Sequence, residues 1–172
     1  MLKLVDETDS VLQRECPEFD FTGSTLADRT AIVDSMVTTM KANNGIGLAA
    51  PQIGESIRLF VMMDDGKPVV CFNAEILQQS SETIVEYEGC LSFPDLWLKL
   101  PRSEWVVGTY KDINGDQVTR RFDGILSRCF MHELEHLNGV CFVSKVGPVK
   151  LAMATKLRKK KQRMKKNGTK EI

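Results

Sequence analysis

The 172-residue sequence has no apolar stretch long enough to span a membrane, and its start, MLKLVDETDS, lacks the basic and apolar regions of a secretion signal. Its five cysteines are odd in number and show no regular disulfide spacing, which favours a reducing compartment. Histidine occurs only twice. We therefore expect a cytoplasmic protein with no membrane partner, whose thiols are free for metal binding or catalysis.

A net charge is also lacking, but the charges are distributed unevenly. Residues 145–172 hold 11 of the 23 Lys and Arg residues and a single acid, Glu171, so the preceding 144 residues carry an excess of ten acids. Such a basic run is usually a solvated tail, and the alternative is a surface that binds ribosomal RNA. In either interpretation, a basic helix or tail over 148–172 follows a main domain over 1–147.

Helical spacing of apolar residues predicts helices over 25–43 and 124–138, and a third that starts near Pro148 and frays into the basic tail. The first of these begins with Thr25 and has Asp28 three residues later, which is the pattern of a capping box. These three segments account for the predicted helical part of the fold.

Between the first two predicted helices, several stretches are rich in β-branched and aromatic residues and predict strands. They are 57–62, 68–72, 83–87, 104–110 and 117–122. The dipeptide Asn114-Gly115 predicts a hairpin between the last two. Residues 1–23 lack periodicity and are expected to form an irregular arm. The expected fold class is therefore α+β, with mostly antiparallel strands around the metal-binding helix described next.

The two histidines, His132 and His136, lie four residues apart in a predicted helix, so both occupy one face, one turn apart. Each can turn one ring nitrogen toward a common ion, and Glu133 can reach a water on that ion. This geometry explains why the H-E-x-x-H pattern recurs in metal-dependent hydrolases. A solvated helix face is the alternative, but two histidines and a glutamate at this spacing favour a metal site.

A hydrolytic metal ion usually has three protein ligands and an open position for water. A third histidine six residues after His136 is absent, because Phe142 occupies that position. No acid lies between His136 and Glu171 either. Both absences disfavour the common zinc proteases, and the search for the third ligand turns to the cysteines.

Three cysteines are candidates for the third ligand. Cys129 lies about 10 Å along the helix axis from His136, too far for its short side chain to share an ion with both histidines. Cys141 lies in an apolar run and is expected in the core. Cys90 follows Gly89 at the end of a strand-like segment, and a glycine lets the backbone approach an ion or ligand closely. Cys90 is therefore the expected third ligand.

Three segments together resemble the motifs of the peptide deformylase family in order and spacing: GIGLAAPQIG (45–54), EGCLS (88–92) and HELEH (132–136). The resemblance runs from the first predicted helix to about residue 145, which makes 1–147 the catalytic domain. It implies a metal-dependent amidase that removes the formyl group from the N-terminal N-formylmethionine of nascent polypeptides and releases formate. It implies no DNA partner.

The resemblance also implies a role for each matching residue. The metal ligands would be Cys90, His132 and His136. Glu133 would be the catalytic acid and base, and Gln52 and the backbone N–H of Leu91 would stabilise the oxyanion. A thiolate with two imidazoles suits Fe²⁺, Zn²⁺, Ni²⁺ or Co²⁺, and the resemblance favours Fe²⁺ in the cell.

Substrate-binding residues are assigned on the same basis. Gly47 would lie beside the substrate backbone, and Gly89 would allow close approach near the metal. Ile46, Ile125 and Cys129 are candidates for the wall of an apolar slot that takes the methionine side chain, with plain core packing as the alternative for each.

The sequence departs from the family pattern at several positions. Met131 and Glu135 replace the usual Gln and Asp of the helix motif, and the resemblance suggests Arg102 as the partner of Glu135. Trp97 stands where bacterial members often carry an arginine nearby, and Arg128 occupies a position that is commonly apolar. Arg128 is therefore expected to alter the pocket mouth.

Two other functions are compatible with parts of the sequence. A general H-E-x-x-H metallopeptidase is disfavoured by the missing ligand downstream of His136. An RNA-binding module with a structural Cys/His metal site is disfavoured because no fourth Cys or His is suitably placed to close the site.

Overall fold

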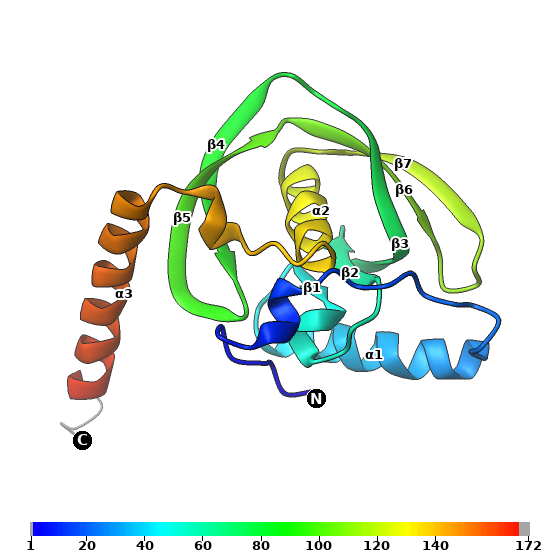
Figure 1. Ribbon diagram of the computed structural model, residues 1–172, viewed down its shortest axis with the longest axis horizontal. Coiled ribbons are helices and arrows are strands. Elements are labelled where there is room, and N and C mark those ends of the chain that lie inside the picture. Colours follow the sequence, from blue (N-terminus) through cyan, green and yellow to red (C-terminus); the bar gives the residue numbers. More distant parts are fainter. Residues whose placement is uncertain (1, 169–172) are drawn as a thin grey trace.

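In the computed structural model, which describes residues 2–168, helix α2 (Gly124–Leu137) lies in the middle of the molecule and contacts both of its sheets (Figure 1). The larger sheet has the strand order β1-β2-β3-β6-β7, and the smaller one is the hairpin β4-β5. All pairings among the described strands are antiparallel, which confirms the expected α+β fold. Residue 1 of the predicted arm and residues 169–172 of the predicted tail lie outside the described residues.

The elements follow one another in a simple order. The strands are β1 (Gly47–Ala49), β2 (Leu59–Asp64), β3 (Lys67–Gln79), β4 (Thr83–Cys90), β5 (Phe93–Ser103), β6 (Trp105–Lys111) and β7 (Gln117–Asp123). The other α-helices are α1 (Leu26–Ala42) and α3 (Pro148–Gly168). The 3-10 helices among residues 2–168 are η1 (Ser10–Gln13), η2 (Ala50–Ile53) and η3 (Phe142–Lys145).

The helices form where the sequence predicts them. At the start of α1, the Thr25 side chain accepts a hydrogen bond from the Asp28 backbone N–H, and the Asp28 carboxylate accepts one from the Thr25 N–H. After the ends of α1 and α2, Asn44 and Gly139 adopt positive φ angles of 55° and 69°. Such left-handed residues commonly terminate helices. Helix α3 begins at Pro148, as expected.

The strand prediction was incomplete, because β1 and β5 were not predicted. Pro94 and Pro101 argue against a strand over 93–103, yet buried and exposed residues alternate strictly from Leu96 to Arg102. Strand β5 pairs with β4 alone, so it is an edge strand. Proline is tolerated at such an edge, where its missing N–H leaves no ladder hydrogen bond unmade.

Aromatic packing holds α2 on the larger sheet. The Phe130 ring stacks on Phe122 at a centroid distance of 5.0 Å and meets Phe60 edge-on at 5.3 Å. Gly108 leaves the room for this ring, because a Cβ at that position would lie 2.4 Å from the end of Phe130. This close packing fixes the distance between α2 and the sheet. It thereby also fixes the position of the two histidines on α2.

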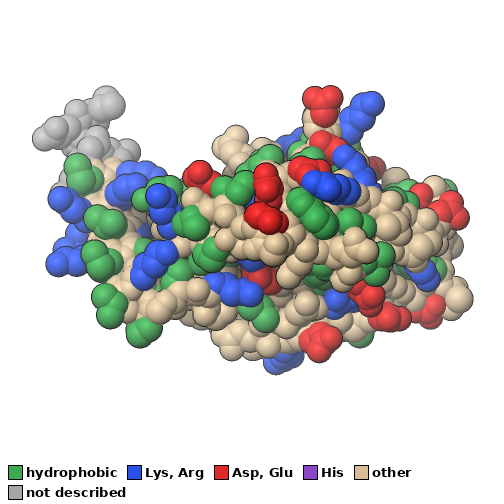
Figure 2. Space-filling model, turned by 90° about the horizontal axis from the view of Figure 1, so that it is seen from above, with side chains coloured by type: hydrophobic (Ala, Val, Ile, Leu, Met, Phe, Trp, Pro, Cys, Tyr) green, Lys and Arg blue, Asp and Glu red, His purple; other side chains and the backbone are tan. Residues whose placement is uncertain are grey.

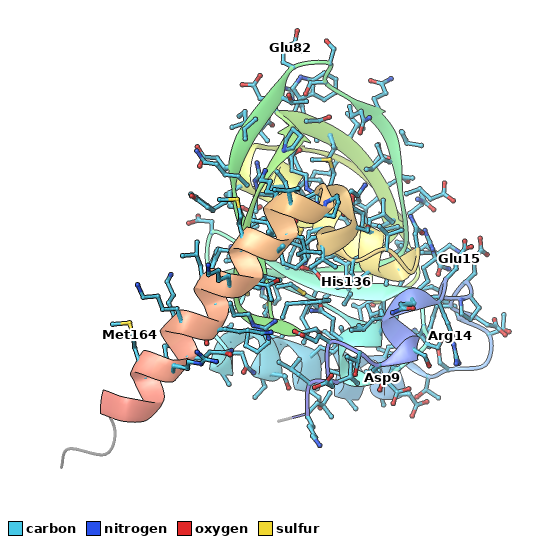
Figure 3. The ribbon with its side chains drawn as sticks, turned by 60° about the vertical axis from the view of Figure 1, so that its left-hand side comes forward. Asp9, Arg14, Glu15, Glu82, His136 and Met164 are labelled. Carbon is cyan, nitrogen blue, oxygen red and sulfur yellow. The ribbon has the colours of Figure 1, made fainter. Side chains whose placement is uncertain are left out.

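The N-terminal arm is irregular apart from η1, as expected, but it packs tightly onto the fold (Figure 3). Leu12 is fully buried, and the Cys16 N–H donates a 2.8 Å hydrogen bond to the carbonyl of Leu137. The Val5 N–H donates a 2.9 Å hydrogen bond to the carbonyl of Gln52. The arm therefore supports both the end of α2 and the helical turn that carries Gln52.

Helix α3 lies along β5 at one side of the molecule (Figure 1). Its inner face places Leu151 and Ala154 against the core cluster beneath β5, and Arg158 forms a 2.7 Å ion pair with Glu7. Its outer face exposes four apolar side chains among basic ones (Figure 2), namely Val149, Met153, Leu157 and Met164. Within residues 2–168, no helix has both the length and the apolar character needed to cross a bilayer.

Candidate metal centre

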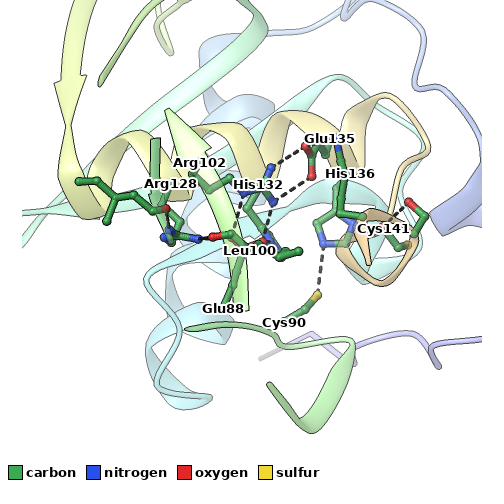
Figure 4. Close-up of polar contacts among 12 residues, drawn as sticks. Glu88, Cys90, Leu100, Arg102, Arg128, His132, Glu135, His136 and Cys141 are labelled. Atoms are coloured by element: carbon green, nitrogen blue, oxygen red, sulfur yellow. Dashed lines mark hydrogen bonds and ion pairs between the residues drawn. The ribbon is translucent and has the colours of Figure 1, made fainter. Parts of the chain in front are cut away.

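The three expected metal ligands converge where β4 ends against α2. Cys90 is the last residue of β4, and His132 and His136 lie one turn apart on α2 (Figure 4). One potential ligand atom from each residue lies within 4.8 Å of the other two, and Cys90 Sγ is 3.2 Å from His136 Nε2. Ligand atoms around one tetrahedral zinc-like ion stand roughly 3.3–3.6 Å apart, so small adjustments let all three share an ion.

Glu88 fixes the orientation of His132. Its Oε1 lies 2.6 Å from His132 Nδ1, so that nitrogen donates the hydrogen bond and Nε2 is left for an ion. Burial opposes ionisation of Glu88, but hydrogen bonds from His132 and Arg102 outweigh it and hold the pKa of the carboxyl well below its usual range. Glu88 is therefore an ionised acceptor at the base of the site.

Glu88 belongs to the EGCLS motif, but its role was not predicted from the sequence. The missed signal is the period of a strand, because residues two apart on a strand share a face. Glu88 and Cys90 are two apart on β4, so a metal ligand at Cys90 also points the Glu88 side chain toward the same helix.

Arg102 joins Glu88 to the helix through two carboxylates. It donates hydrogen bonds of 2.9 and 2.6 Å to Glu88 and of 2.5 and 3.0 Å to Glu135, which confirms the predicted contact between Arg102 and Glu135 (Figure 4). Lys145 adds a 2.8 Å ion pair to Glu135. These charged groups tie β4, β5 and α2 together behind the metal ligands.

Arg128, which was expected to alter the pocket mouth, is buried beside this network and lines the cavity. It donates hydrogen bonds to Glu88 Oε2 at 3.1 Å and to the carbonyls of Leu100 and Ile84 at 3.2 and 2.8 Å. The Glu88 carboxylate thus balances a second guanidinium, and the side chain of Arg128 forms part of the pocket wall.

Replacing Arg102 by methionine is expected to destabilise the fold by about 3 kcal/mol, because Glu88 and Glu135 lose a buried partner. The loss is held to the lower end of the usual range because Arg128, His132 and Lys145 still face these carboxylates. The unfolding midpoint in urea measures the effect. Because Glu88 also orients His132, the metal retained after dialysis shows whether that orientation is lost.

The matched control is Arg121→Met, which removes an arginine from an exposed pair with Asp123. Exposed ion pairs contribute little, so this variant should unfold at the wild-type midpoint. Equal midpoints for the two variants would show that the Arg102 contacts carry no stability.

Glu133 stands buried beside the three ligands with one carboxylate oxygen, Oε2, lacking a hydrogen-bond partner among the described residues. Burial raises the pKa of this carboxyl to about 7, with the His132 ring opposing the shift and Glu88 adding to it. Gly47 makes the room, since a Cβ there would lie 2.3 Å from Glu133 Oε1 and 2.6 Å from Cys129 Sγ. An unpartnered carboxylate with such a pKa can exchange a proton with a neighbouring group.

Gln52 is held in a defined orientation. Its side-chain oxygen accepts a 2.8 Å hydrogen bond from the Ala49 N–H, so its Nε2 must point the other way, 3.4 Å from both Cys90 Sγ and Ser92 Oγ. Leu91 follows Cys90 in the turn between β4 and β5. An amide donor is thus aimed at the space beside the candidate ligands.

A cavity of about 570 Å³ opens onto this site. Its lining includes every residue predicted for catalysis or substrate binding, together with Cys90 and His132, whereas His136 is buried inside the fold and is not part of the lining (Figure 3). Cys129 is buried in the wall, and Ile46 and Ile125 are half exposed at the mouth. Apart from His136, the predicted residues therefore line one cavity.

The chain is similar to known deformylases in sequence and in structure. The family model described as polypeptide deformylase matches residues 1–152. The peptide deformylase of Thermotoga neapolitana is 41% identical over 124 residues, which cover 72% of this chain and 76% of that protein.

Two solved structures show the same fold. A peptide deformylase from Legionella pneumophila superposes with a TM-score of 0.85 at 31% identity. The superposition covers 96% of this chain and 97% of the Legionella chain. One from Synechococcus elongatus, in complex with actinonin, gives 0.83 at 36% identity, with coverages of 91% and 85%. The chain therefore belongs to the polypeptide deformylase family, whose metal-dependent members remove the N-formyl group from nascent polypeptides.

Proposed function

We propose that this chain hydrolyses the formyl group of N-formylmethionyl polypeptides with a metal ion held by Cys90, His132 and His136. The observation that carries the proposal is the convergence of these three ligand atoms within 4.8 Å, beside the unpartnered carboxylate of Glu133. A divalent ion held by these residues would polarise the formyl carbonyl and lower the pKa of a bound water. Its ligand chemistry suits Fe²⁺, Zn²⁺, Ni²⁺ or Co²⁺, and the likeness to the family favours Fe²⁺ as the cellular occupant.

The residues around the ion divide the remaining work. Glu133 takes the proton of the attacking water and gives it to the amine nitrogen as the bond between formyl carbon and nitrogen breaks, which leaves formate and a free amino group. Gln52 Nε2 and the backbone N–H of Leu91 donate hydrogen bonds to the oxyanion that forms on the formyl oxygen. Glu88 accepts the hydrogen bond of His132 Nδ1 and so leaves Nε2 to hold the ion.

The cavity gives the substrate its place. Gly47 and Gly89 carry no side chain, so the substrate backbone can pass close to both on its way to the ion. The methionine side chain enters the slot whose wall includes Cys129, with Ile46 and Ile125 at its mouth. This arrangement suits an apolar first residue.

Formate release from formyl-Met-Ala-Ser tests the proposed function. Protein purified anaerobically with iron or nickel should release formate and leave the internal peptide bonds intact, and dialysis against a chelator should abolish the release. Absence of formate with a full complement of metal, or cleavage at an internal peptide bond, would contradict the proposal.

We further propose that α3 holds the enzyme at the ribosome, in the cytoplasm, where N-formylmethionyl chains emerge. Lys159, Lys160 and Lys161 are exposed on α3, and basic side chains lie among apolar ones along this helix (Figure 2). In this arrangement residues 1–147 supply catalysis and residues 148–172 supply a surface for anionic RNA.

Cosedimentation with ribosomes at low salt should be lost when residues 157–172 are deleted. Because that deletion also removes the pair of Arg158 with Glu7, a variant with glutamine at Lys159, Lys160 and Lys161 serves as the sharper test. It should weaken binding and reduce its salt dependence. Lys41→Gln, an exposed change on α1, is the control. Cosedimentation that survives both changes to α3 would refute the ribosome proposal.

A further inference from the structure

Four large apolar side chains surround the mouth of the catalytic cavity and stay at least 49% exposed, namely Ile46, Tyr87, Trp97 and Ile125. They come from separate parts of the chain: the segment before β1, strand β4, strand β5 and helix α2. Exposed apolar side chains are ordinary when they are scattered, but a group around one opening marks a binding surface. This group continues the lining of the cavity that holds the metal ligands.

The register of the β4–β5 hairpin places the two aromatic residues on one face. Gly89 pairs with Trp97, and Tyr87 pairs with Lys99. Paired residues, and residues two apart on a strand, share a face, so Tyr87 and Trp97 are diagonal neighbours. The Trp97 indole lies flat over Gly89, because a Cβ at Gly89 would be 3.2 Å from three of its ring atoms. We call Tyr87 and Trp97 the aromatic platform.

The aromatic platform lies within reach of the substrate chain. A strand rises about 3.3 Å per residue, so Tyr87 is about 10 Å from Cys90 along β4, and Gly89 beneath Trp97 is the immediate neighbour of Cys90. A substrate that leads away from the metal alongside β4, in an extended conformation, advances by a similar distance per residue. Side chains of its second and third residues therefore pass the aromatic platform while the formyl group is at the metal.

We propose that the aromatic platform selects N-formylmethionyl chains whose second or third residue is apolar or aromatic. The inference rests on the proposed function of the site and assigns Tyr87 and Trp97 to substrate specificity. An aromatic side chain laid on these rings gains ring contact and removes exposed apolar surface from water. This contact lowers the KM of such a substrate. It does not change kcat, because the rings of Tyr87 and Trp97 lie away from the bond that breaks.

Steady-state kinetics with three peptides test the inference: formyl-Met-Ala-Ser, formyl-Met-Phe-Ser and formyl-Met-Ala-Phe. The wild-type enzyme should show a KM about fivefold to tenfold lower for at least one of the two aromatic peptides. Trp97→Ala and Tyr87→Ala should reduce that preference, and Trp97→Phe should restore most of it because a ring is kept. Both side chains are largely exposed, so these variants should fold as the wild-type protein does.

Leu77→Ala is the matched control, since Leu77 is an equally exposed apolar residue on β3 that does not line the cavity. It should leave all three KM values unchanged. Formate release with equal KM values for the three peptides, or a preference that survives Trp97→Ala and Tyr87→Ala, would refute the aromatic platform alone. Absence of formate from every peptide would instead refute the proposed function of the site.

Discussion

Replacing Glu133 by glutamine is expected to lower kcat for formate release by about 1,000-fold, the middle of the range for loss of a general acid and base. Glutamine has nearly the shape of glutamate, so the space beside Gly47 stays filled, but it cannot take a proton from water and return it to the amine. Metal content should stay at the wild-type level because Glu133 is not among the three converging ligands. Formate assays and elemental analysis of the same sample measure both quantities.

The neighbouring glutamate on α2 provides the control for this variant. Glu135 is held by Arg102 and Lys145 and does not line the cavity. Glu135→Gln should therefore cost about tenfold, the lower end of the usual range for groups that orient a metal ligand, because Glu135 reaches His132 only through Arg102 and Glu88. If Glu133→Gln kept its metal and a kcat within tenfold of wild type, Glu133 would not be the proton carrier. Loss of metal in Glu133→Gln would point to a structural role.

Local geometry explains why much of the site could be predicted from the sequence. The period of one helix fixes His132 and His136 on one face, and the absence of a ligand downstream favours Cys90 as their partner. The structure brings these three residues together, and it shows the predicted contact between Arg102 and Glu135. Short-range periodicity and the list of available ligand types were sufficient for this part.

Contacts between distant segments could not be predicted in the same way. The pattern of residues 1–23 does not indicate that Val5 anchors the carbonyl of Gln52, because that contact depends on how the whole arm packs. Strand β5 was missed because its prolines act against a central strand, whereas only the completed sheet shows that β5 lies at an edge.

The burial of Arg128 could not be predicted from the sequence either. In the sequence it is a cation at a position that is commonly apolar, and an exposed place is the ordinary expectation for an unpaired arginine. In the structure it is buried because Glu88, also bonded to Arg102 and His132, accepts one of its hydrogen bonds. A single carboxylate therefore sets the orientation of a metal ligand and the burial of two guanidinium groups, and no spacing rule reveals that sharing.

Adding one methyl group at Gly47 is expected to lower kcat/KM by about 100-fold, although Gly47 supplies no side chain to the chemistry. In Gly47→Ala the new Cβ would stand 2.3 Å from Glu133 Oε1 and 2.6 Å from Cys129 Sγ, closer than real Cβ contacts allow. Glu133 must move away from the water it deprotonates, and a displacement near 1 Å costs about that factor. None of the three ligands is among the nearest atoms to the added methyl, so metal content should stay unchanged.

The control for Gly47→Ala is Gly147→Ala, because a Cβ at Gly147 meets nothing within 4 Å. That variant should keep wild-type kcat/KM, which separates the effect of position from the general cost of removing a glycine. Combining Gly47→Ala with Glu133→Gln adds a second check. If the methyl acts by displacing Glu133, it should cost far less than 100-fold once the carboxylate is gone, because the two changes remove the same function. Full additivity of the two losses would contradict this explanation and place the effect of Gly47 on the path of the substrate backbone.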